Sequence, residues 1–140
     1  MKRIIPAAAL ALLLGSGAAF AQQANVDNVQ TVRDLAAVCD PATTGVPRLE
    51  AIAYCQGFLT SFGKHHASMH GAMHPAGGPS RAPFCVPNPG PSVAQSGVAF
   101  ARWSRENPAH ISAPALEGLM RWAQESFPCP TTARAPRAAR

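Results

Sequence analysis

The sequence predicts an all-α fold, a small four-helix bundle cross-linked by two disulfides. Two observations carry this prediction. Apolar residues recur at three- and four-residue steps in four separate segments, and no segment shows the alternation typical of a half-buried strand. The chain also contains four cysteines, and an even number in a small exported protein indicates paired disulfides.

Export is predicted from the first residues of the chain. Lys2 and Arg3 give a positive start, and an apolar run follows from Ile4 to Leu14. A small-x-small pattern then ends at Ala21, where we expect signal-peptide cleavage. Because the apolar run is shorter than the ~20 residues that cross a bilayer, we expect no membrane span. The predicted destination is the periplasm.

The chain divides into three parts by composition. We expect a signal peptide over residues 1–21, a helical domain over residues 22–130, and a disordered Ala/Arg/Pro tail over residues 131–140. The formal net charge of +5 comes from the two ends, because residues 22–129 contain seven basic and seven acidic side chains. A neutral body with few aromatics and no basic stripe indicates no nucleic-acid partner.

The first two helices are predicted from periodicity and proline positions. The first runs from about Asn28 to Cys39, where Asp40-Pro41 ends it. The second starts at Pro47, a favourable first helical position. We expect Gly57 to allow a neighbouring helix to approach closely. The apolar stripe of the second helix consists of Leu49, Ile52, Cys55, Leu59 and Phe62.

The last two helices follow a long break. Glycines and prolines over residues 71–91 predict about twenty residues without regular structure. Ser92 is suited to cap the third helix, which Asn107-Pro108 ends. The fourth helix has Pro114 in its first turn and ends at Pro128. Short helices joined by turns in this way are typical of a bundle.

The cysteine positions favour one disulfide pairing. Cys39 and Cys55 lie in phase with the apolar stripes of two neighbouring helices, while Cys85 precedes the third helix and Cys129 ends the fourth. Antiparallel packing would bring Cys39 to Cys55 and Cys85 to Cys129, and the two other pairings stay open. No Cys-x-x-Cys pair is present, so a four-thiolate metal site is less favoured than disulfides.

Several short motifs in a fixed order make the chain resemble the Rap/Tai family of immunity proteins, which act against type VI secretion amidase effectors. The resemblance spans residues 31–130 and includes a first helix that fits Leu35 to Cys39. The other motifs are Cys55-Gln56-Gly57-Phe58, Phe84-Cys85-Val86-Pro87, Gln95, Glu106-Asn107-Pro108 and Phe127-Pro128-Cys129.

The resemblance implies a periplasmic, all-helical, disulfide-bonded protein that binds a cognate peptidoglycan amidase and obstructs its active site. It also implies a homodimer. We expect no catalysis and no cofactor, because the cysteines are used in disulfides and Ser92 is used as a cap. His110 lies in a predicted turn between helices, where a surface role is favoured over that of a general base.

The chain departs from the family pattern at HHASMHGAMHP, residues 65–75, where relatives have a shorter acidic or polar stretch. We favour a variable surface loop here, with His65, His66, His70 and His74 as candidate contacts to the partner. The alternative is a periplasmic copper-binding protein, if the second helix continues past Gly63. Imidazole and thioether ligands suit copper, but no nearby carboxylate orients them. The candidate ligands are His66, Met69, His70, Met73 and His74.

Overall fold

The computed structural model describes residues 25–73 and 82–130, in which the regular elements are all helices apart from one isolated bridge. The predicted fold class is therefore confirmed. The predicted signal peptide, residues 74–81 of the predicted loop, and the predicted tail lie outside the described residues. The helices are α1 (Val32–Cys39), α2 (Gly45–Met73), α3 (Val93–Glu106), the short 3₁₀ helix η1 (Pro108–His110) and α4 (Ala115–Ser126).

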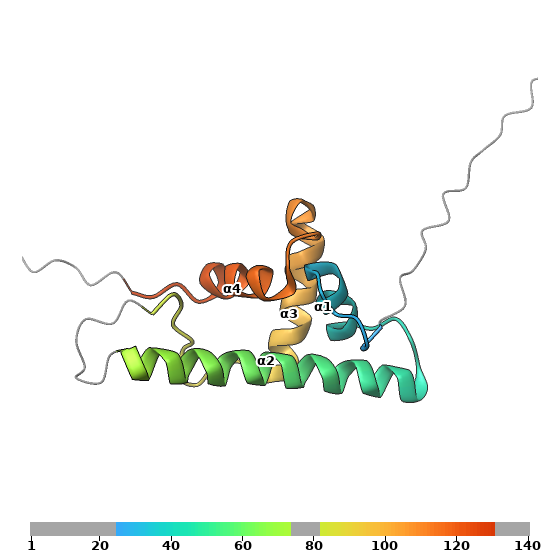
Figure 1. Ribbon diagram of the computed structural model, residues 1–140, viewed down its shortest axis with the longest axis horizontal. Helices are drawn as coiled ribbons and strands as arrows, with labels where there is room; N and C mark the ends of the chain where they lie inside the picture. Colours follow the sequence, from blue (N-terminus) through green and yellow to red (C-terminus); the bar gives the residue numbers. More distant parts are fainter. Residues whose placement is uncertain (1–24, 74–81, 131–140) are drawn as a thin grey trace, which may run out of the picture.

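Helices α2, α3 and α4 are arranged around α1 (Figure 1). Helix α1 packs against α2, α3 and α4, so this shortest helix is the centre of the bundle. Helix α2 runs along one side of the molecule, α3 crosses it, and α4 lies beside its C-terminal half. The largest fully buried side chains come from α1, α3 and α4, and are Phe100, Leu35, Leu119, Val32 and Val38.

Helix α1 begins at Val32, later than the expected start near Asn28. The Thr31 hydroxyl accepts from the Asp34 N–H, and the Asp34 carboxylate accepts from the Thr31 N–H at 2.9 Å. The Val32 N–H meanwhile donates to the Ala113 carbonyl at 2.9 Å. This pairing keeps the chain extended before Val32, so the apolar period continues upstream of the helix without forming helix.

The favoured disulfide pairing is confirmed. Cys39 bonds to Cys55 and Cys85 bonds to Cys129, with Cα–Cα distances of 5.0 and 4.8 Å. The first bond lies in the core between α1 and α2. The second joins the segment before α3 to the residue three positions after α4. The two bonds therefore hold different pairs of segments together.

The expected close approach at Gly57 was wrong, because nothing lies within 4 Å of a Cβ placed there. The close approach occurs instead at Gly97 on α3, where a Cβ would lie 2.9 Å from the Cys55 Sγ. A second occurs at Gly118 on α4, which packs directly on Val32. The absence of a side chain at these two positions lets α3 and α4 reach α1 and its disulfide.

Helix α2 is much longer than expected, with 29 residues that continue through Gly63 to Met73. The prediction of a loop over residues 65–73 was therefore wrong. The predicted apolar stripe was also wrong at its start, since Leu49 is 66% exposed while Ala51, Cys55 and Leu59 are buried. Burial at these three positions anchors the helix and outweighs the ~1 kcal/mol that each interior glycine costs. Among the described helices, none has the length and apolar character needed to cross a membrane.

Candidate partner-binding surface

The C-terminal turns of α2 carry three of the four candidate histidines. His65 is exposed, while His66 and His70 are partly buried. His66 and His70 lie one turn apart, with ring centroids 6.2 Å from each other. His65 directly precedes His66 and lies on a different face of the helix. His74 lies outside the described residues. The structure therefore brings His66 and His70 together and separates His65 from them.

His66 packs on an aromatic side chain from outside the helix. Its ring stacks on Phe84 at a centroid distance of 4.2 Å, and Phe84 also stacks on Phe62 at 5.8 Å. Burial in this stack lowers the pKa of His66, and the neighbouring imidazoles of His70 and His65 lower it further. The neutral form of His66 is thus the one that the fold favours.

Phe84 is also held in place by the residues that follow α4. The Cys85 N–H donates to the Phe127 carbonyl at 2.8 Å, and the Cys85–Cys129 disulfide fixes the same segment. Phe84 itself is 7% exposed. The short segment around Cys85 therefore ties the end of α4 to the C-terminal half of α2.

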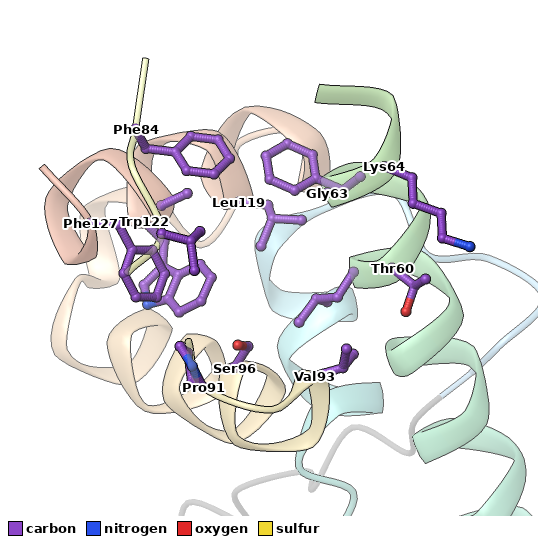
Figure 2. A pocket seen from close by; sticks show the side chains of 14 residues that line it. Thr60, Gly63, Lys64, Phe84, Pro91, Val93, Ser96, Leu119, Trp122 and Phe127 are labelled. Carbon is purple, nitrogen blue, oxygen red and sulfur yellow. The ribbon is translucent and has the colours of Figure 1, made fainter. Parts of the chain in front are cut away.

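A cavity of about 330 Å³ lies between α2 and α4 (Figure 2). The segments around Phe84 and Pro91 and the first turn of α3 complete its wall. The lining is mostly apolar and aromatic, and Lys64 is the one charged residue among the described residues that form it. The lining residues are Leu59, Thr60, Phe62, Gly63, Lys64, Phe84, Val86, Pro91, Val93, Ser96, Leu119, Trp122, Ala123 and Phe127.

A second, more open hollow of about 580 Å³ lies along another face of α2. Phe62 belongs to the walls of both hollows, so its ring stands between them. His65 lines the second hollow beside Leu116 of α4, which is 57% exposed. This arrangement joins one candidate partner contact to an exposed apolar surface. The other lining residues are Tyr54, Gly57, Phe58 and Ser61.

Residues 25–73 and 82–130 bring no three His, Cys, Asp or Glu side chains together as metal ligands. Of the proposed copper ligands, His66 and His70 are near each other, and Met69 is 47% exposed on the same turns. The Met73 side chain and His74 lie outside the described part of the chain. One face of the His66 ring is already covered by Phe84.

Sequence reasoning missed the stack of Phe62, Phe84 and His66 and the cavity beside it. The available signal was Phe84 itself, an aromatic residue directly before a disulfide cysteine in a stretch rich in proline. His110 has the expected position between helices, but its ring stacks on Trp103 at a centroid distance of 6.0 Å. It is therefore a packing residue as well as a turn residue.

A family model for the Rap1a immunity proteins matches residues 31–129. This range begins at the cap of α1 and ends at the last cysteine, so it includes all four α-helices and both disulfides. The chain belongs to the Rap1a immunity protein family. Searches of curated proteins and of solved structures found no significant match. The residues matched by the family model thus include the α2 histidines, the Phe84 stack and the lining of the cavity.

Proposed function

We propose that this protein of the Rap1a immunity family is exported to the periplasm, where it binds and inhibits a secreted peptidoglycan amidase. The observation that carries the proposal is the family match over residues 31–129. Export is supported by the signal-like residues 1–21 and by two disulfides, which form in oxidising compartments. The amidase and the homodimer come from the sequence resemblance to Rap/Tai proteins.

In this proposal, inhibition requires a rigid surface that binds the amidase, and no catalysis by this protein. The disulfide Cys39–Cys55 holds the middle of α2, and the stack of Phe62 and His66 on Phe84 holds its C-terminal half, so this part of the helix surface is preformed. A preformed surface loses little conformational entropy on binding. We place the contact on the C-terminal half of α2, where His65 and Leu116 border an exposed apolar hollow. His66 contributes by fixing this part of the helix against Phe84.

The decisive experiment combines the purified mature protein with an exported amidase encoded beside its gene. We expect a stable complex by size-exclusion chromatography with light scattering, and stoichiometric loss of cleavage of peptidoglycan fragments. The same chromatography on the protein alone tests the homodimer. His65→Ala should weaken the complex, while the exposed Arg102→Ala on α3 serves as the control. Full amidase activity in an excess of the protein would contradict the proposal.

Export is tested separately by fractionating cells that express the full chain. We expect the mature protein in the periplasmic fraction, with an N-terminus at Gln22 as cleavage after Ala21 predicts. An unprocessed chain in the cytoplasm, with free thiols, would contradict the periplasmic assignment without affecting family membership.

One observation favours a second candidate function, copper binding. Helix α2 remains helical through Met73, so Met69 and His70 each lie one turn after His66, as the copper hypothesis requires. Titration with Cu(I) against a competing chelator tests it. Tight stoichiometric binding that is lost in His66→Gln/His70→Gln would establish this function, and binding no tighter than that of the double variant would refute it.

A further inference from the structure

We propose that the cavity between α2 and α4 is a binding site for an acyl carboxylate of medium chain length. The proposal is independent of the immunity function and of any partner protein. Three features of the described residues carry it: a slot between two helices that do not pack closely together, a mostly apolar lining, and Lys64 as the one charged side chain in that lining.

The slot exists because α2 and α4 each pack on α1 but are not closely packed against each other. Phe62 and Phe84 reach across the separation from the α2 side and from the segment before α3. The volume of about 330 Å³ falls in the range of small-molecule sites, roughly 300–1,000 Å³. A slot between two helices suits a linear chain better than a globular ligand.

The interior of the slot is apolar. Leu119 is fully buried, and Trp122, Ala123 and Leu59 are nearly so. Phe127 lies beside Trp122 in the lining (Figure 2). Each methylene group that leaves water for such a surface strengthens binding by about fourfold at most. Affinity should therefore rise from hexanoate to octanoate to decanoate.

The charge at the mouth selects the head group. Among the residues that the structure describes, no Asp or Glu lines the cavity, and no ion pair involves Lys64. The Lys64 amine points out of the cavity toward solvent in Figure 2, while its stem borders the apolar wall. A ligand with its chain inside and a carboxylate at the mouth would meet the Lys64 amine once the flexible lysine side chain turns toward the cavity, and Thr60 and Ser96 offer hydroxyl groups in the lining.

Binding is measured by titrating the purified protein with decanoate below its micelle concentration. Trp122 lines the cavity and Trp103 does not, so Trp103→Phe leaves one reporter at the site. We expect a saturable change in the fluorescence of Trp122, with a calorimetric stoichiometry of one. No saturable change in either measurement at millimolar decanoate would overturn the proposal.

The role of Lys64 is tested by exchanging charges on both sides. Decanoate should bind about fivefold more tightly than decyltrimethylammonium, which has the same chain and the opposite charge. Lys64→Glu should remove or reverse this preference, whereas Lys64→Gln should only reduce it. Equal affinity of the wild-type protein for both ligands would overturn the assignment of the head group.

The location is tested by filling the slot. Gly63 lies in its wall, and nothing lies within 4 Å of a Cβ placed there, so Gly63→Leu is accommodated and occupies the site. Gly71→Leu is the matched control, since it lies on the same helix with equal space and outside the lining. We expect binding to weaken more than tenfold in Gly63→Leu and to stay unchanged in Gly71→Leu. Equal binding by both variants would show that decanoate binds elsewhere and would overturn the proposal.

Discussion

The two disulfides are chemically equal but lie in different surroundings. Cys39 and Cys55 are 7% and 2% exposed, and α3 packs directly on their bond at Gly97. Cys85 and Cys129 are partly exposed, and the segment they fix borders a cavity. The first bond is therefore buried beneath α3, with only a small hollow of about 130 Å³ beside it. The second bond is partly exposed, and its neighbours Phe84, Val86 and Phe127 line the larger cavity of about 330 Å³. This difference separates a bond that is buried in the core from one that fixes the segment beside the cavity.

The largest effect is expected from removing the buried bond. The chain-entropy model gives Cys39–Cys55, with a sequence separation of 16, a contribution of about 3 kcal/mol. Cys39→Ala/Cys55→Ala also leaves a void beneath Gly97, which adds roughly 1–2 kcal/mol. We expect a total loss of about 4–5 kcal/mol in the free energy of unfolding, measured by urea titration. A loss under 2 kcal/mol would show that α1 and α2 are held by other contacts.

The exposed bond should cost slightly less when it is removed. Cys85–Cys129 closes a longer loop, with a separation of 44, and the same model gives about 4 kcal/mol. Cys85→Ala/Cys129→Ala should lose about that much, because partly exposed sulfur atoms leave no buried void. If this variant proved less stable than the double variant of the buried pair, loop entropy alone would rank the two bonds. The surroundings of each bond would then contribute little.

The ends of α3 show what local sequence signals can predict. Ser92 caps it and its hydroxyl accepts from the Gln95 N–H at 3.2 Å, as its residue type predicts. Asn107 before Pro108 ends it at the expected residue. The disulfide pairing followed from the order of the helices for the same reason, since each cysteine lies at a recognisable place in its helix.

The end of α2 and the cavity could not be predicted in the same way. Gly63 is a weak local signal for a helix end, and contacts with Phe84, distant in the sequence, decide the outcome. The cavity depends on the separation of Leu59 from Leu119, which belong to different helices. Periodicity identifies which side chains turn inward but gives no measure of the space between two helices.

A third effect concerns the helical glycines, which also differ in their surroundings. Gly97 and Gly118 are closely packed, whereas Gly57 has open space around it. Gly118→Ala would drive its Cβ into the buried Val32, and Gly97→Ala would press on Cys55. We expect each to lose about 1–3 kcal/mol by thermal or urea unfolding, because overpacked cores adjust poorly. Adding Val32→Ala to Gly118→Ala should recover part of the loss. Gly57→Ala is the control, and with open space around it should gain up to ~1 kcal/mol. A loss of stability in Gly57→Ala equal to that in Gly118→Ala would show that close packing at Gly118 is not the cause.

The smallest loss of stability concerns His66, a residue of α2 whose ring packs on Phe84 beside the cavity. His66→Ala removes the stack on Phe84 and should cost about 1 kcal/mol, whereas the exposed His65→Ala should cost almost nothing. His66→Phe keeps an aromatic ring at the same place and should preserve the stability. A loss in His65→Ala as large as in His66→Ala would show that the stack on Phe84 does not hold this part of the helix.

The same residue gives the stability of the protein a dependence on pH. Burial lowers the pKa of His66 below its ordinary value of 6.5, and His70 and His65 lower it further. The unfolded chain therefore binds a proton at a higher pH than the folded protein does. The contribution of His66 is complete above about pH 6.5 and is lost as the pH falls through the lower folded pKa. Urea unfolding between pH 7.5 and pH 4.5 should show this loss in the wild-type protein. It should be smaller in His66→Phe, because phenylalanine does not titrate, and identical slopes in the two proteins would assign the dependence to other groups.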